Sequence, residues 1–226
     1  MAAHPSLKVP ASAGPIRAMR REAATLAPVR AQGSERQRQI VEIALDLVAE
    51  RGADSVSIQA IADRIGVTQP AIFRHFRDKE AIWIAVMEWL ADNLRQIHAT
   101  AELQSNETPL DVLRRMFLDH IRMVRRYPAL AKVVFSDHLR LQFPSLQTRF
   151  SAIHDAYEAR VVDLIGRAKK QKLVPAAISD EGAATMYFCM IQGLGFQFAI
   201  ARRPMRLAQE AERLFALYMR AIARQE

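Results

Sequence analysis

The sequence has a single cysteine and lacks the motifs of the common phosphate-binding and hydrolytic enzymes. Cys189 alone excludes a disulfide framework within the chain and a cysteine-rich zinc site, and it is typical of the reducing cytosol. No glycine-rich phosphate loop and no Gly-x-Ser-x-Gly elbow occur, because Gly193 and Gly195 fall within a predicted helix. We therefore expect a protein that is not an enzyme, with no catalytic residues and no cofactor.

The chain also has no secretory signal near its start and only one long run without charge. No apolar stretch of signal-peptide length follows the N-terminal methionine, so we expect a cytoplasmic protein. Residues 182–201 carry no charged side chain over twenty positions, which is the length of a membrane span. The polar residues Gln192 and Gln197 favour a helix buried in a core or a subunit interface. We therefore expect no membrane partner.

Basic side chains outnumber acidic ones, but unevenly along the chain. The 32 Lys and Arg residues against 24 Asp and Glu give a net charge of +8, which favours an anionic partner such as nucleic acid, phosphate or a membrane surface. Residues 111–172 carry most of this excess, whereas residues 42–80 are slightly acidic. We interpret the basic excess as a solvated face, with an anionic effector or partner as the alternative.

Apolar residues recur at helical spacing from Glu35 onward, which predicts an all-α fold of about nine helices. Residues 1–33, with scattered arginines and Pro5, Pro10, Pro15 and Pro28, predict a disordered basic arm. The expected helices lie at about 34–51, 57–65, 68–76 and 79–97, and then at 109–127, 128–141, 145–173, 179–202 and 205–224.

Residues 57–76 predict two short helices joined by a tight turn at Gly66 and Val67, which is the pattern of a helix-turn-helix. Ser57 and Thr68 are the expected helix N-caps. The side chains expected to pack inward are Ile72, Phe73 and Phe76, and those expected to face outward are Gln69, Arg74 and His75. For His75, packing between aromatic rings is the alternative.

The segment SIQAIADRIGVTQPAIFRHFRDKE, residues 57–80, resembles the DNA-binding domain of TetR/AcrR-type transcriptional regulators. With the first predicted helix, the resemblance covers about residues 34–94. Pro70 and Phe73 depart from the common pattern, since the family commonly has tyrosine at the position of Phe73. The resemblance implies a three-helix DNA-binding domain at 34–80 and a larger helical effector-binding and dimerisation domain at 81–226.

The resemblance also implies which residues contact double-stranded DNA. Thr68, Gln69, Pro70 and Ala71 would approach base edges in the major groove, and the Gln69 amide suits a bidentate contact with adenine. For each residue, a purely structural role or simple solvation is the alternative. The other implied contacts, to phosphates and the flanking backbone, are Arg36, Arg38, Ser57, Phe73, Arg74, His75 and Lys79.

In regulators of this type the C-terminal helices bind a small effector, and the resemblance implies the same here. Flexible methionines and aromatic rings suit an apolar ligand, although the same residues also build any helical core. The spacing of the histidines matches no common metal-binding motif, so we expect no metal. The candidate ligand-binding residues are Met116, Phe117, His120, Met123, Phe135, His138, Phe143, Tyr157, Met186, Tyr187 and Met190.

The last two predicted helices are the candidate homodimer interface. Two helices from each subunit would form a four-helix interface about a twofold axis and pair two reading heads for a palindromic operator. Packing of both helices within the monomer is the alternative. The candidate interface residues are Gly193, Phe196, Leu207, Leu214, Leu217 and Tyr218.

The resemblance implies a TetR-like repressor that a small, largely apolar effector releases from its operator, with the long helix from Lys79 as the lever between pocket and head. The stretch from Arg126 to Arg140, in which an apolar helix follows Tyr127 and Pro128, is also similar to family members that act in nucleoid occlusion. The alternative is therefore a DNA-binding regulator whose C-terminal domain binds a protein partner in place of a small ligand.

Overall fold

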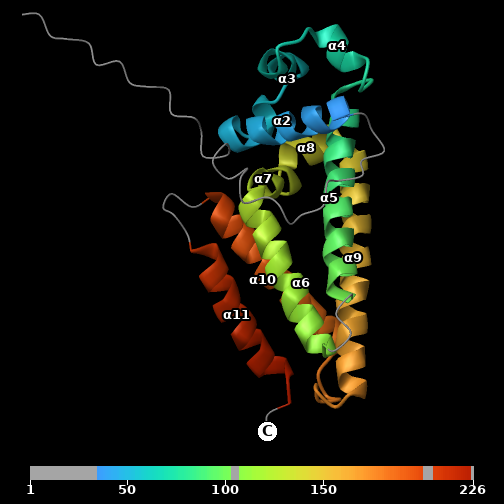
Figure 1. The fold of residues 1–226 in the computed structure, drawn as a ribbon, viewed down its shortest axis with the longest axis vertical. Helices are drawn as coiled ribbons and strands as arrows, with labels where there is room; N and C mark the ends of the chain where they lie inside the picture. The colour runs from blue at the N-terminus through green and yellow to red at the C-terminus, as the bar shows by residue number, and fades with distance from the viewer. Residues whose placement is uncertain (1–34, 103–106, 201–205, 225–226) are drawn as a thin grey trace, which may run out of the picture. The chain divides into compact units, whose positions relative to one another are not determined.

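The computed structural model describes residues 35–102, 107–200 and 206–224, all within a compact unit from Ala31 to Glu226, and the described residues form helices and no strand (Figure 1). The disordered arm predicted for residues 1–33 lies outside them. The elements are α2 (Glu35–Arg51), the 3₁₀ turn η1 (Ala53–Ser55), α3 (Ile58–Ile65), α4 (Gln69–Phe73), α5 (Lys79–Glu102), α6 (Pro109–Arg126), α7 (Ala129–Val134), α8 (Asp137–Gln142), α9 (Pro144–Lys170), α10 (Asp180–Ile200) and α11 (Leu207–Ile222).

Helices α2, α3 and α4 form a small head, which packs on the start of α5 (Figure 1). Apolar residues of α2 such as Ile40 and Val48 are completely buried. Ile61 of α3 and Trp83 of α5 have at most 1% of their surface exposed. Each such side chain contributes about 1.5–3 kcal/mol when it is removed from water. The head is therefore held by one continuous apolar core that extends into α5.

The body consists of α5, α6, α9, α10 and α11, with α6 in contact with all four of the others. Leu113, Met116 and Phe117 of α6 have no exposed surface, which is the burial expected of a central helix. The start of α6 is fixed by a capping box, in which the side chains and backbone amides of Thr108 and Asp111 bond reciprocally.

The single helix predicted at 128–141 is wrong, because the structure has two short helices there, α7 and α8. The hydroxyl of Ser136 accepts a hydrogen bond from the Leu139 amide at 3.2 Å and starts a new helix. The chain turns at Phe135, and both short helices lie between α2 and the body (Figure 1). This arrangement places α7 against the head and against α10.

Helix α10 is the one described helix that is long and apolar enough to span a membrane by length and composition. It packs on α6, α9 and α11, and seven of its residues, including Tyr187 and Leu194, are buried. These contacts are those of a core helix with one face left uncovered.

Candidate nucleic-acid interface and interior cavity

The two helices α3 and α4 are set by local capping and a glycine turn. The Ser57 hydroxyl accepts a hydrogen bond from the Ala60 amide at 3.1 Å, which confirms Ser57 as the N-cap of α3. Gly66 ends α3 with φ of 80°, a left-handed conformation that favours glycine. Ile72 and Phe76 are buried, so they hold α4 against the helices behind it.

Phe73 is exposed over 46% of its surface, so the expectation that its ring packs inward is wrong. The α4 helix has only five residues, and with Ile72 directed into the core its neighbour faces solvent. The outward surface of this short helix is completed by Thr68, Pro70 and Arg74, which are exposed. Gln69, Ala71, His75 and Lys79 are partly exposed on the same segment. We call residues 68–75 the reading face.

Thr68 occupies the N-cap position of α4, but its side chain makes no capping hydrogen bond within the part of the chain that the structure describes. The prediction of a capping role for this hydroxyl is therefore wrong. The backbone nitrogen of Ala71 instead bonds to the Thr68 carbonyl at 3.0 Å. The exposed Thr68 hydroxyl keeps its hydrogen-bonding capacity for a ligand on the reading face.

A chain of side-chain hydrogen bonds connects α4 to α3 on the exposed side of the head. The amide nitrogen of Gln69 donates to Oε1 of Gln59 at 2.7 Å, and the Gln59 amide donates in turn to Asp63. The Asp63 carboxylate can only accept hydrogen bonds, so it fixes the donor-to-acceptor direction from Gln69 through Gln59 to Asp63. The sequence pattern does not identify Gln59 as a site residue. Its position on α3 four residues before Asp63 does predict that those two side chains meet.

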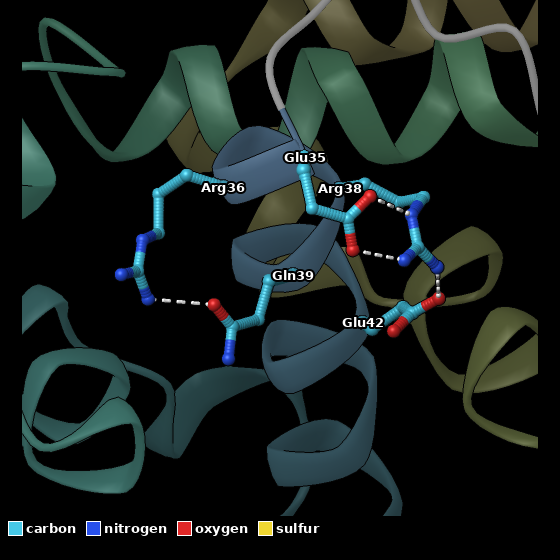
Figure 2. A network of polar contacts seen from close by, with 5 residues as sticks. All are labelled: Glu35, Arg36, Arg38, Gln39 and Glu42. Atoms are coloured by element: carbon cyan, nitrogen blue, oxygen red, sulfur yellow. Dashed lines mark hydrogen bonds and ion pairs between the residues drawn. The ribbon is translucent and has the colours of Figure 1, made fainter.

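The two arginines at the start of α2 are engaged with their own helix (Figure 2). Arg38 binds Glu35 and Glu42, and the Arg38 hydrogen bond lowers the pKa of the Glu35 carboxyl. On the other side of the helix, Arg36 donates to Oε1 of Gln39 at 2.6 Å (Figure 2). A phosphate contact by Arg38 would have to compete with two carboxylates, whereas Arg36 would give up one neutral partner.

Polar contacts join the end of α4 to α2 and cap the start of α5. The Gln37 amide donates to the His75 carbonyl at 3.2 Å, and the Asp78 carboxylate accepts from the Ala81 amide at 2.7 Å, so Asp78 starts α5. Lys79 is half-buried, and this burial lowers the pKa of its ammonium, an effect that Asp54 opposes. The Lys79 ammonium is therefore less accessible to a phosphate group than the ammonium of a fully solvated lysine.

The body contains a partly open, largely apolar cavity of about 100 Å³. Three of the predicted ligand-binding residues line it: His120, Phe135 and Tyr157. Sequence reasoning missed the rest of the wall because these residues come from five helices that are distant in the chain. They are Leu90, Leu94, Val124, Ala131, Val134, Phe150, Ile153, His154, Phe188, Ile191, Gln192 and Gly195.

The other predicted ligand residues do not line this cavity. Met116, Phe117 and Tyr187 have no exposed surface and belong to the core, as does the buried Met123. Met186 is exposed on α10, whereas Met190 and Phe143 are partly exposed. His138 lines a second, shallower cleft at the surface, next to Phe135.

The cavity and the surface cleft share two wall residues, Ala131 of α7 and Phe135 at the C-cap of that helix. The cleft is also lined by Gly52, Ala53 and Asp54, which follow α2 in the head. On the same short helix, the Lys132 ammonium donates to the Ala49 carbonyl of α2 at 2.9 Å. Helix α7 therefore contacts the cavity and the head at once.

An aromatic and histidine cluster lies against the cavity. The Tyr157 and Tyr187 hydroxyls are 3.1 Å apart, and burial raises the pKa of both phenols. The His120 ring stacks on Tyr157 with centroids 5.5 Å apart. Burial, reinforced by the nearby His98, lowers the pKa of His120 to about 3, so its imidazole is neutral at pH 7.

His154, Asp155 and Glu158 are the one group in the described residues whose ligand atoms approach each other closely enough to share a metal ion. Their atoms lie within 4.8 Å of one another, but Asp155 is exposed, and His154 Nδ1 is 3.8 Å and 4.0 Å from the two carboxylates. Three exposed or partly exposed groups on one helix do not form the enclosed set of a structural metal site.

The uncovered face of the body runs along α10 and α11. Phe196 is exposed over 50% of its surface and Leu217 over 48%, and Gly193 and Leu214 are partly exposed. Two other predicted interface residues lie inside the monomer: Leu207 is buried, and the buried Tyr218 donates to the Ala183 carbonyl at 3.1 Å. A subunit interface on this face therefore excludes Leu207 and Tyr218.

The paired helices α3 and α4, with an exposed polar face on the second, define a helix-turn-helix DNA-binding protein. Residues 40–86 match the family model described as bacterial regulatory proteins, tetR family. The HTH-type transcriptional regulator AcrR of Shigella flexneri is 23% identical over 193 residues, which span 83% of this chain and 89% of that protein. Residues 40–86 therefore form a tetR-family DNA-binding domain, and the chain is similar to TetR/AcrR-type transcriptional regulators.

Other relatives carry different names. The nucleoid occlusion factor SlmA of Haemophilus ducreyi is 25% identical over 159 residues, which span 69% of this chain and 77% of that protein. The ketosteroid transcriptional regulator KstR2 of Mycobacterium tuberculosis superimposes with a TM-score of 0.69 at 20% identity, over 86% of this chain and 98% of that chain. This last likeness establishes a common fold.

Proposed function

We propose that this regulator is a cytoplasmic repressor that binds a palindromic operator as a homodimer and is released by a small, largely apolar effector. The observation that carries the proposal is that one chain has both an exposed reading face at residues 68–75 and an apolar cavity, with α7 in contact with both the cavity and the head. The reading face would bind DNA, and the cavity would bind the effector that controls this binding.

Base recognition is assigned to the reading face, residues 68–75. The Gln69 amide can form two hydrogen bonds with adenine, and its bond to Gln59 holds it on the exposed side of α4. The Thr68 hydroxyl, which caps nothing, adds a second polar group at the start of the same helix. Pro70, Ala71 and Phe73 supply apolar surface for a thymine methyl group.

Backbone contacts are assigned to Arg74 and His75 at the end of α4, to Lys79 at the start of α5 and to Arg36 on α2. Ser57 sits at the N-terminus of α3, where free amides suit a phosphate. Arg38 contributes least, because Glu35 and Glu42 already bind it. Phosphate contacts of this kind fix the position of the head on DNA but carry no base information.

The homodimer is assigned to the uncovered face of α10 and α11. Exposed apolar side chains mark interaction sites when they gather on one face, and Phe196, Leu217, Leu214 and Gly193 are exposed or partly exposed on these two packed helices. A second copy of the chain would bury this face about a twofold axis and pair two heads. The half-site spacing of the operator would then follow from the distance between the two α4 helices.

Release follows if the effector binds one arrangement of the helices better than the other. Two elements join the cavity to the head. Helix α5 lines the cavity with Leu90 and Leu94 and begins beside the head at Lys79. Helix α7 lines it with Ala131 and Val134 and binds α2 through Lys132. A ligand that moves either wall would shift α2 and with it α3 and α4.

The second candidate is a regulator whose C-terminal domain binds a protein, as the name of the Haemophilus ducreyi relative suggests for that protein. In this chain the stretch from Arg126 to Arg140 forms α7 and part of α8, and its apolar residues Leu130, Val133 and Leu139 are buried. Because these side chains pack inside the monomer, they are not available to a protein partner, which favours the small effector. The basic excess of residues 111–172 is also largely paired, as in Arg114 with Glu212 and Arg115 with Glu107.

Sequencing of the chromosomal sites bound by the protein tests the proposal. We expect a small number of palindromic sites and loss of binding to them when an apolar small molecule is added. Many dispersed sites, with no small molecule able to release the protein from any of them, would instead support the protein-partner alternative.

A further inference from the structure

The cavity wall contains a buried polar atom that has no hydrogen-bond partner among the described residues. His120 lines the cavity, and its Nδ1 is shut off from solvent without such a partner. The neighbouring Tyr157 hydroxyl, in contrast, is already paired with Tyr187. Buried polar groups without a partner are rare in folded proteins because each costs about 1–3 kcal/mol.

A bound water is a poor solution for this imidazole. An ordered interior water needs about two to four polar partners, and apolar cavities of this size stay dry. Most of the wall is apolar, as at Leu90, Leu94 and Val124, and the Tyr157 hydroxyl is already paired, which leaves Gln192 and His154 as the other polar wall residues. A ligand that brings its own polar group into an otherwise apolar space satisfies the imidazole and keeps the apolar contacts.

The charge of that polar group is constrained by the wall. No lysine or arginine is among the described residues that line the cavity, and the carboxylates of Asp155 and Glu158 lie beside His154, another wall residue. An anion would therefore lose its hydration without gaining a cation. His120 supplies no charge, since burial lowers its pKa to about 3.

We propose that the effector is an uncharged, mainly apolar molecule with a single hydroxyl group, which hydrogen-bonds to the imidazole of His120. A neutral imidazole has one N–H donor and one acceptor nitrogen, and a hydroxyl can bond to either. The proposal rests on the proposed function only in naming this molecule an effector. The cavity of about 100 Å³ is smaller than the cavity of roughly 150 Å³ that holds benzene, so the ligand is limited to about one small ring unless the wall adjusts.

Three matched probes test the proposal by calorimetric titration of the full-length protein: 4-ethylphenol, ethylbenzene and 4-ethylbenzoate. They share one apolar frame and differ in the polar group. We expect 4-ethylphenol to bind about fivefold more tightly than ethylbenzene, the ratio that corresponds to one net hydrogen bond. We expect 4-ethylbenzoate to bind at least about tenfold more weakly than the phenol, because its charge must be desolvated.

Variants locate the contact. In His120→Phe, which keeps a ring of similar size, the preference for the phenol over ethylbenzene should disappear, and in His120→Gln it should return in part. His154→Phe is the matched control, since it removes the other histidine of the same cavity and should leave the preference intact. If His120→Phe fails to fold, the His120→Gln and His154→Phe pair still compares the two histidines.

Equal binding of the phenol and ethylbenzene to the wild type, tightest binding by the benzoate, binding by none of the three, or a phenol preference that survives in His120→Phe would each overturn the proposal. Operator release is measured separately, by fluorescence anisotropy of DNA selected with the same protein. His120-dependent binding of the phenol without release would leave the hydroxyl site intact and contradict the proposed effector response.

Discussion

The head and the body of this protein treat their polar side chains in opposite ways. In the head, polar groups lie at the surface and satisfy one another, as in the bond from Gln69 to Gln59 and the pairing of Arg38 with two glutamates. In the body, Nδ1 of His120 is buried in a largely apolar wall without a hydrogen-bond partner among the described residues. Polar groups on a surface that binds DNA can hydrogen-bond to water when the DNA is absent. A polar group inside a cavity depends on the ligand for its hydrogen bond.

The largest expected effect comes from breaking the core behind the reading face. Ile72 is 1% exposed, and Ile72→Ala should lower the free energy of unfolding by about 2–5 kcal/mol because it leaves a cavity between α4 and the helices behind it. Chemical denaturation followed by circular dichroism measures the change. Phe73→Ala is the control on the adjacent residue, which is half-exposed, and should cost less than about 1 kcal/mol while still weakening DNA binding. Equal losses of stability in the two variants would show that Phe73 is packed inward.

The next effect separates base recognition from phosphate contact within the head. Gln69→Ala should relax base preference at one operator position and cost about 1–3 kcal/mol there. Binding to a set of operator variants, measured by anisotropy, tests this. Unchanged binding to every variant would mean that the reading face has been assigned to the wrong residues.

Two further variants refine this result. Lys79→Ala should weaken all operator sequences alike and lower the slope of affinity against salt by about one. Gln59→Ala should act in the same direction as Gln69→Ala but less strongly, because it removes the group that positions the Gln69 amide and not the amide itself.

A variant of α7 tests whether the two regions communicate there. Lys132→Met keeps the length of the side chain and removes the donor to the Ala49 carbonyl. We expect unchanged ligand binding, nearly unchanged DNA binding, and a reduction of about 0.5–2 kcal/mol in the coupling between them. The coupling is measured as the ratio of ligand affinities with and without operator DNA. Full coupling in this variant would assign the transmission to α5 alone.

The smallest effects compare the two N-caps of the helix-turn-helix. Ser57→Ala should lower stability by about 1 kcal/mol, since the Ser57 hydroxyl accepts the Ala60 amide. Thr68→Ala should change stability by no more than about 0.5 kcal/mol, because the Thr68 side chain makes no such bond. Thermal unfolding of both variants checks the difference. A loss at Thr68 as large as that at Ser57 would restore the capping role that the sequence suggested.

The predictable parts of this protein are those that depend on neighbours in the chain. The segment from Ser57 to Gly66 folds as expected because its cap, its apolar residues and its terminating glycine all lie within ten positions and point to the same helix. The prediction of one helix at 128–141 fails because of a weaker local signal. The single residue Ser136, inside an apolar stretch, is enough to start a second helix. Phe73 was misplaced because a five-residue helix is too short for periodicity to decide which aromatic ring faces the core.

The sequence by itself determined the all-α fold, the position of the helix-turn-helix and the family, since each is written in contiguous residues and their spacing. Only the tertiary structure decided the wall of the cavity, the burial of His120 Nδ1 without a partner, and the contact of Lys132 with Ala49, two residues that are 83 positions apart in the chain. It also decided that Tyr218 belongs to the monomer while Leu217 next to it is uncovered. Periodicity gives the apolar face of each helix, but which helix covers that face depends on packing between distant segments.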